Sequence, residues 1–174
     1  GLKITIKIIN INKIVGTSLI ILKNLDVFLL DSQTFQSKQD LYGDNQIDRL
    51  FKEINNTGAT FTIIASPNPF TFNTEESFMN FREEFEYFRN RLNEVDNNGI
   101  VLLSSGDVSN SSQLNQYSLE EKPNGVQSFV YEFNTPSLSD NTYSLISIKG
   151  SENNRILYLH IMSFFSYVFQ NLWF

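Results

Sequence analysis

Carboxylates follow two short apolar runs of this chain, and they are the residues best placed for chemistry. Residues 104–107 read Ser-Ser-Gly-Asp and come directly after the aliphatic run 100–103. Such a run is typical of a buried parallel strand. Because glycine lets the backbone turn at the strand end, Asp107 is expected at the sheet edge where α/β proteins bind ligands. Asp31 follows the apolar run 27–30 in the same way, so both carboxylates are candidate metal ligands.

Each of these carboxylates has two interpretations. A metal ligand at Asp107 would be accompanied by an imidazole, but the residue two positions further on is Ser109. A turn residue would instead accept backbone N–H groups after Gly106, and the missing histidine favours this role. Asp31 has the same two interpretations, and its expected structural role is to cap the loop that follows it.

The other candidates for chemistry have no recognisable partners. His160 is the single histidine and lies in the apolar, strand-like run 156–161, where a partly buried structural histidine is expected. Ser104, Ser105 and Ser109 lie outside any G-x-S-x-G motif and have no base beside them in the sequence. The chain has no cysteine, which excludes thiol catalysis, disulfides and thiolate-bound zinc. We therefore expect no catalytic residue.

The composition is that of a globular domain with an acidic surface. The 174 residues are 41% hydrophobic and include sixteen phenylalanines, which is enough for one domain over 1–174 with a substantial core. The net charge of −6 repels phosphate backbones, so a general nucleic-acid binder is excluded. The absence of cysteine leaves the cellular compartment open.

Hydrophobic periodicity predicts an α/β arrangement in the first part of the chain. The expected strands cover residues 4–8, 19–22, 27–30, 59–65 and 100–103. Helices are expected from 44 to 54 and from about 74 to 95, where apolar residues recur at steps of three and four. The two prolines in 66–69 predict a structured loop. Alternation of strand and helix over 31–107 predicts a mostly parallel sheet flanked by helices.

The pattern changes after Asp107. A polar loop is expected over 109–125, followed by strand-like segments at 127–133, 143–148 and 155–161. Because no helical pattern separates these segments, we expect them to pair in antiparallel fashion.

Five segments of the chain, in order, carry motifs of a known family. They are Leu30-Asp31-Ser32-Gln33 and residues 42–50, 59–66, 103–109 and 131–138. Together they resemble the PhoD-like (alkaline phosphatase D) branch of the calcineurin-like metallophosphoesterases. The similarity covers roughly residues 20–150 and only the C-terminal half of the family. It implies a partial metallophosphoesterase sandwich, with Asp31 and Asp107 at positions that bind metal in the family.

Three positions depart from the family motifs. The arginine that follows Leu-Asp-x in the family is Gln33, which supplies no fixed charge to a phosphate. The motif histidine is Ser109, a poor metal ligand beside an imidazole, and the motif tryptophan is Arg49. The N-terminal half, from which the family draws its remaining ligands, has no counterpart here. Asp31 and Asp107 alone are too few ligands to hold two metal ions.

These departures lead to two hypotheses about function. The first is a degenerate domain without catalysis or cofactor that serves as a structural or interaction subunit of a larger assembly. The second is a fragment of a metal-dependent phosphodiesterase or alkaline phosphatase, completed by another polypeptide and using Ca, Fe, Zn or Mn ions.

The C-terminal segment 156–174 is almost uncharged and ends in an aromatic-rich sequence. It is barely as long as a membrane-spanning helix and contains His160, Gln170 and Asn171, so burial in the domain or in a partner is favoured over membrane contact. Half of a sandwich also leaves sheet edges and one apolar face uncovered. We therefore expect a protein partner that covers a sheet edge and the apolar C-terminus.

Overall fold

A computed structural model describes the residues that form a seven-stranded mixed sheet and the helices beside it. Side chains are described for 25–59, 61–95, 99–106, 113–119 and 129–134, and backbone alone for the remaining residues of the strands. The strand order is β1-β2-β3-β4-β5-β7-β6. The strands of this sheet are β1 (Lys7–Ile9), β2 (Ser18–Leu22), β3 (Leu25–Leu29), β4 (Phe61–Ser66), β5 (Ile100–Ser105), β6 (Gln113–Glu121) and β7 (Gln127–Thr135).

Four neighbouring strands of the sheet run in the same direction. β3 pairs with β4, β4 with β5 and β5 with β7, each in parallel register. β1, β2 and β6 are antiparallel to their neighbours. The carboxyl ends of β3, β4, β5 and β7 therefore meet at one edge of the sheet, which is where ligands bind in open α/β sheets.

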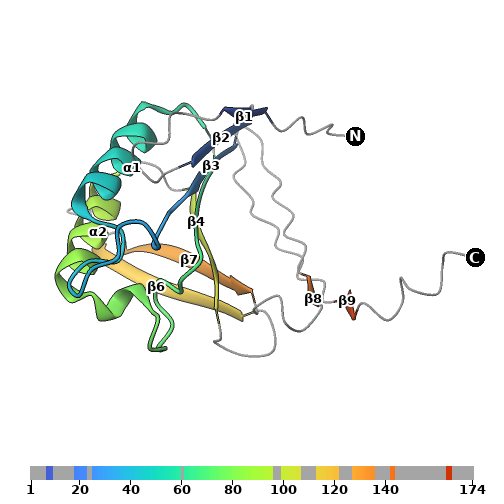
Figure 1. Cartoon of the computed structure of the whole chain (residues 1–174). Helices are drawn as coiled ribbons and strands as arrows, with labels where there is room; N and C mark the ends of the chain where they lie inside the picture. Colours follow the sequence, from blue (N-terminus) through green and yellow to red (C-terminus); the bar gives the residue numbers. More distant parts are fainter. Residues whose placement is uncertain are drawn as a thin grey trace, which may run out of the picture.

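Two described α-helices cover the same face of this sheet (Figure 1). Helix α1 (Asp44–Asn56) buries the apolar residues Ile47, Leu50, Phe51 and Ile54, which recur at helical spacing. It starts after Gly43, whose φ of 77° is readily adopted by glycine. Helix α2 (Arg82–Glu94) buries Phe85, Phe88 and Leu92 in the same way. These two amphipathic faces close the core against the sheet.

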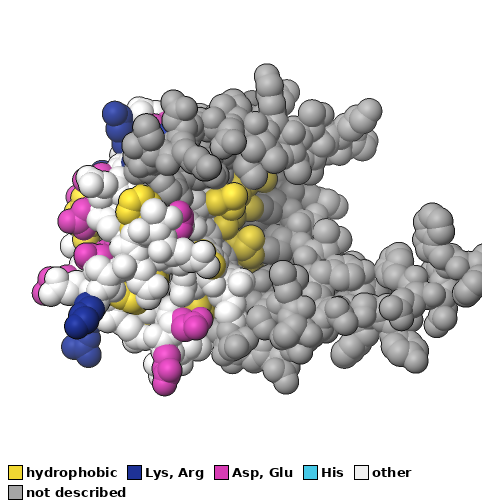
Figure 2. Space-filling model, in the orientation of Figure 1, with side chains coloured by type: hydrophobic (Ala, Val, Ile, Leu, Met, Phe, Trp, Pro, Cys, Tyr) yellow, Lys and Arg dark blue, Asp and Glu magenta, His cyan; other side chains and the backbone are white. Residues whose placement is uncertain are grey.

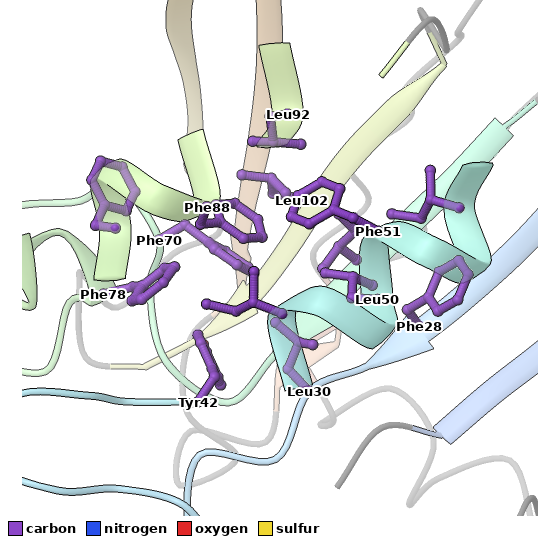
Figure 3. Close-up of a cluster of buried hydrophobic side chains, with 14 of the residues drawn as sticks. Phe28, Leu30, Tyr42, Leu50, Phe51, Phe70, Phe78, Phe88, Leu92 and Leu102 are labelled. Atoms are coloured by element: carbon purple, nitrogen blue, oxygen red, sulfur yellow. The ribbon is translucent and has the colours of Figure 1, made fainter. Parts of the chain in front are cut away.

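The core lies between the helices and the sheet (Figure 3). Each parallel strand contributes one buried side chain to it: Phe28, Ile64, Leu102 and Val130. Phe88 of α2 stacks on Phe70 at a centroid distance of 5.7 Å and meets Phe78 edge-on at 5.4 Å. Aromatic pairs of this kind add about 0.5–1.5 kcal/mol each beyond the burial of their area.

The opposite face of the sheet is also apolar, and its exposure varies: Val101 of β5 and Phe133 of β7 are buried, whereas other side chains on this face are exposed. Leu29 of β3 is 40% exposed, and Phe129 and Tyr131 of β7 are 44% and 36% exposed. Figure 2 shows hydrophobic atoms in the middle of the molecule over β3 and β4, whereas charged side chains gather over the helices. Within the described residues, α-helices thus cover one face of the sheet and not the other.

The structure confirms the expected α/β class, with a parallel sheet centre and flanking helices. The helix expected from 74 is shorter, since α2 begins at Arg82 after a 3-10 turn, η1 (Phe78–Asn80). The physical reason is a competing set of hydrogen bonds. The N–H groups of Phe78 and Met79 donate to the carbonyls of Pro69 and Phe70, which fixes this stretch to the preceding loop.

The expectation of a polar loop over 109–125 is wrong, because β6 occupies Gln113–Glu121. The Gln, Asn and Ser residues of this segment do not show the apolar alternation from which a strand is predicted. Its Tyr117 nevertheless packs on Phe85 of α2 at a centroid distance of 5.9 Å. The expected antiparallel pairing holds for β6 with β7, but β7 also pairs in parallel with β5. β7 enters the sheet between β5 and β6, so sequence neighbours β5 and β6 are not spatial neighbours.

The last part of the chain has two described strands, β8 (Thr142–Tyr143) and β9 (Phe164–Phe165), which pair with each other. The remaining residues of the expected strands at 143–148 and 155–161, including His160, lie outside the described residues. The same holds for the segment 156–174 apart from β9. In the part of the chain that the structure describes, no helix has the length and apolarity needed to cross a bilayer.

Candidate functional site

The candidate site is the edge at which the four parallel strands end. Asp31 and Ser32 follow β3, the loop 66–69 follows β4, and Gly106 follows β5. Asn134 lies near the end of β7. The sequence prediction placed Asp31 and Asp107 at this edge. The structure shows Asp31 there, whereas Asp107 and Ser109 lie outside the described residues.

Asp31 holds the turn that follows β3. Its Oδ1 accepts the N–H groups of Gln33 and Thr34 at 2.9 and 3.0 Å, and its Oδ2 accepts the Thr34 hydroxyl at 2.6 Å. Partial burial alone raises the pKa of Asp31, but the hydrogen bonds from Thr34 and Gln33 outweigh it and lower the pKa below its ordinary value. The carboxylate is therefore ionised at neutral pH and bound by its own loop.

Gln46 of α1 fixes the backbone of Asp31 from the inside. Its Oε1 accepts the Asp31 N–H at 2.8 Å, and its Nε2 donates to the Asp31 carbonyl at 3.0 Å. The same Nε2 donates to the carbonyl of Tyr42, also at 3.0 Å. Gln46 is buried, so these bonds tie the first turn of α1 to the end of β3.

The loop 66–69 is as structured as its prolines predict. The Ser66 hydroxyl accepts the Asn68 N–H at 2.8 Å and donates to the Asn68 carbonyl at 2.7 Å. Ser32 donates to Asn68 Oδ1 at 2.6 Å, which joins this loop to the end of β3. The buried hydroxyl of Tyr42 also contacts Ser66 Oγ, and burial raises the pKa of Tyr42. Tyr42 is thus a neutral hydrogen-bonding group at any ordinary pH.

Glu132 of β7 is a second carboxylate beneath this edge, and it is fully buried. Its oxygens accept the N–H groups of Phe70 and Thr71 at 2.8 and 2.7 Å and the Thr71 hydroxyl at 2.6 Å. The hydroxyl of Ser104 donates to it at 2.5 Å and accepts from Asn134 Nδ2 at 3.1 Å. Ser104 is buried in this network.

Glu84 of α2 holds the loop before α1 in a similar way. Its carboxylate accepts the N–H groups of Leu41, Tyr42 and Gly43 at 2.5, 3.0 and 2.5 Å. Burial raises the pKa of Glu84, and the three hydrogen bonds oppose that rise in part. These three N–H groups lie outside the strands and helices, so the buried carboxylate of Glu84 supplies the acceptors that secondary structure would otherwise provide.

Gly106 brings the end of β5 against the loop 66–69. Its φ is +138°, a conformation that side chains with Cβ rarely adopt. A Cβ at this position would lie 3.0 Å from Cδ of Pro69. The turn that leads to Asp107 is therefore packed closely on the loop that follows β4.

The described residues do not fit a two-metal centre. Among them, no three Asp, Glu, His or Cys side chains lie close enough together to hold an ion. Asp31 binds Gln33 and Thr34 with its two oxygens, and the side chain of Gln33 is exposed. We therefore assign no reaction step to a metal at this edge.

The comparisons with known proteins bear on the fold. No family model and no curated protein matches the chain. A solved structure described as "Structure of PhoD" matches with a TM-score of 0.53 and 18% sequence identity, over 69% of this chain. The chain therefore has a PhoD-like fold, as its motifs predicted. It covers 28% of the length of that PhoD chain, well under half of it.

Sequence reasoning missed the three buried residues that hold this edge together: Gln46, Glu84 and Glu132. Each lies on the apolar side of an otherwise regular amphipathic element. Glu132, for example, alternates with Val130 on the side of β7 that faces the core. A polar residue at a core position is the signal that could have found them, because such a group needs buried partners.

Proposed function

We propose that this chain is a PhoD-like domain without phosphoesterase activity, which serves as a structural or interaction subunit of a larger assembly. The observation that carries this proposal is the set of hydrogen bonds that the Asp31 carboxylate accepts. Its two carboxylate oxygens accept three hydrogen bonds from the following turn, which is the geometry of a loop cap. The substitutions at Gln33 and Ser109 point the same way, because neither residue supplies what the family motifs supply there.

A second candidate function is a fragment of an active metal-dependent phosphodiesterase or alkaline phosphatase. It is favoured by the fact that the chain spans 28% of the PhoD chain it matches. In this case another polypeptide would bring the remaining ligands to the edge at Asp31, and Ca, Fe, Zn or Mn ions would bind between the two. The partner would then be rich in Asp, Asn and His.

The activity of the purified full chain tests the first proposal. The chain is incubated with Mn²⁺, Zn²⁺, Fe²⁺ or Ca²⁺ and assayed with bis-p-nitrophenyl phosphate. We expect no metal-dependent turnover above the buffer rate. Metal-dependent turnover that Asp107→Asn abolishes and the matched surface change Asp44→Asn retains would overturn the proposal.

The native assembly tests the second candidate. Mass spectrometry of the complex purified from its source would identify the companion chains, and cross-linking would place them relative to Asp31. A companion that contributes Asp, Asn or His side chains to this edge, together with activity of the complex, would support the fragment interpretation. An assembly without such a chain would eliminate it.

A further inference from the structure

An acceptor motif for N-linked glycosylation lies at the end of helix α1. Residues 55–57 read Asn-Asn-Thr, which matches the pattern N-x-S/T, and the middle residue is not proline. A second match at 110–112 lies outside the described residues. For the match at 55–57, the structure shows where the asparagine and the threonine are placed, so this position can be judged by its geometry.

Asn55 lies on the solvent side of α1, away from the apolar face that packs on the sheet. Asn55 is exposed, and so are Asp48 and Lys52, which lie seven and three positions before it on the same side of the helix. An N-linked oligosaccharide is bulky and needs solvent around it. An oligosaccharide on the side-chain nitrogen of Asn55 would therefore leave the packing of α1 on the sheet undisturbed.

Thr57, the third residue of the motif, follows the helix and is bound to the sheet. Its backbone is extended, with φ −84° and ψ 145°, so α1 ends at Asn56 and the motif spans the helix end. The Thr57 hydroxyl donates to Asp26 Oδ2 of β3 and accepts the Ala59 N–H at 3.1 Å. Because the transferase must reach this hydroxyl, the sugar has to be attached before Thr57 binds Asp26, while the chain is still unfolded.

We propose that Asn55 is a site of N-linked glycosylation. The second substrate of this reaction is an oligosaccharide carried on a lipid diphosphate. The side-chain amide nitrogen of Asn55 forms a bond to the anomeric carbon of the first sugar, and the bond from that carbon to the diphosphate oxygen breaks. The lipid diphosphate leaves with the bonding electrons, and one amide proton passes to a base of the transferase.

The place of the oligosaccharide in the fold follows from how the two ends of α1 are anchored. Gln46 in the first turn binds the backbone of Asp31 just after β3. Thr57 after the last turn binds Asp26 near the start of β3. The helix therefore runs antiparallel to β3, and Asn55 lies toward the amino ends of the parallel strands.

An oligosaccharide at this position is on the opposite edge of the sheet from the candidate site. The carboxyl ends of β3, β4, β5 and β7, with Asp31, stay open to a partner chain, whereas a bulky glycan keeps proteins away from the end of α1. This inference goes beyond the proposed function and holds for either of its two candidates, because neither of them uses Asn55.

The first experiment uses the protein purified from its source. Peptide N-glycosidase in heavy-oxygen water removes the oligosaccharide and converts a glycosylated asparagine to an aspartate that carries the heavy isotope. We expect mass spectrometry of the digested protein to find this label at position 55. An Asn55 without the label would overturn the proposal.

The second experiment uses the full chain secreted from eukaryotic cells behind a cleavable leader. Asn55→Gln should remove one oligosaccharide from the intact mass, whereas the matched control Asn56→Gln, at an exposed neighbouring position that leaves the motif intact, should retain it. Circular dichroism should be the same before and after enzymatic removal of the oligosaccharide. An Asn55→Gln chain that keeps every oligosaccharide would overturn the proposal, and so would a loss caused by Asn56→Gln or a glycosylated chain that is unfolded.

Discussion

Two buried glutamates in the described part of this protein, Glu84 and Glu132, accept hydrogen bonds from backbone N–H groups. Glu84 accepts three of them from the loop before α1, and Glu132 accepts two from the loop after β4. Irregular loops inside a domain must satisfy their backbone groups, and a carboxylate can accept several donors at once. These two glutamates therefore explain how the loops at the strand ends are held without secondary structure.

The first prediction concerns Glu132. Glu132→Gln keeps one acceptor oxygen but turns an NH₂ group toward donors of Phe70 or Thr71, which leaves buried donors unpaired. We expect a loss of about 2–3 kcal/mol in the free energy of unfolding, measured by urea denaturation. The control Glu76→Gln, at an exposed position, should stay within about 0.5 kcal/mol. If Glu132→Gln left the free energy of unfolding unchanged, the role assigned to this carboxylate would be wrong.

The second prediction uses the pH dependence of Asp31. Its pKa is lowered in the folded state, so it contributes stability above its ordinary value of 3.8 and loses it as the pH falls through the folded pKa. Asp31→Ala should therefore destabilise the chain by about 1 kcal/mol at pH 7. The difference should shrink toward pH 3 in urea denaturation. A difference that stays constant with pH would show that the ionised form has no structural role.

At the scale of elements, a close contact at the end of β5 positions this strand against the loop that follows β4. Gly106 brings the end of β5 close to Pro69, and Gly106→Ala would force both an unfavourable φ and a contact of 3.0 Å. We expect a loss of about 1–3 kcal/mol in thermal or urea denaturation. Gly58→Ala is the matched control, because nothing lies within 4 Å of its Cβ. Its effect should fall within about 1 kcal/mol of zero.

Elements with a strong apolar period were predictable from the sequence. Helix α1 and the parallel strands lie where the pattern placed them, because burial of one face decides their structure. The errors arose where tertiary contacts decide instead. Residues 74–81 have a helical period, yet the loop at Pro69 and Phe70 takes up the N–H groups of Phe78 and Met79. β6 has few apolar residues and depends on its pairing with β7.

The candidate site was predictable in position but not in detail. The apolar runs before Asp31 and Gly106 indicated the carboxyl edge of the sheet, and Asp31 is bound there as a turn residue. The partners Gln46 and Glu132 come from elements distant in sequence. Their identity depends on how α1 and β7 pack against the edge, and no local pattern contains that information.

At the scale of the whole molecule, the described helices cover one face of the sheet, and adjacent residues of β3 test this directly. Phe28 faces the helix layer and is 1% exposed, whereas Leu29 faces the other way and is 40% exposed. Phe28→Ala should therefore lower the free energy of unfolding by about 3–5 kcal/mol. Leu29→Ala should lower it by about 1 kcal/mol or less. Both values come from urea denaturation of the full chain, with the slope checked for constancy. Equal losses would mean that a second layer covers Leu29 in solution, and that the core is closed on both faces of the sheet.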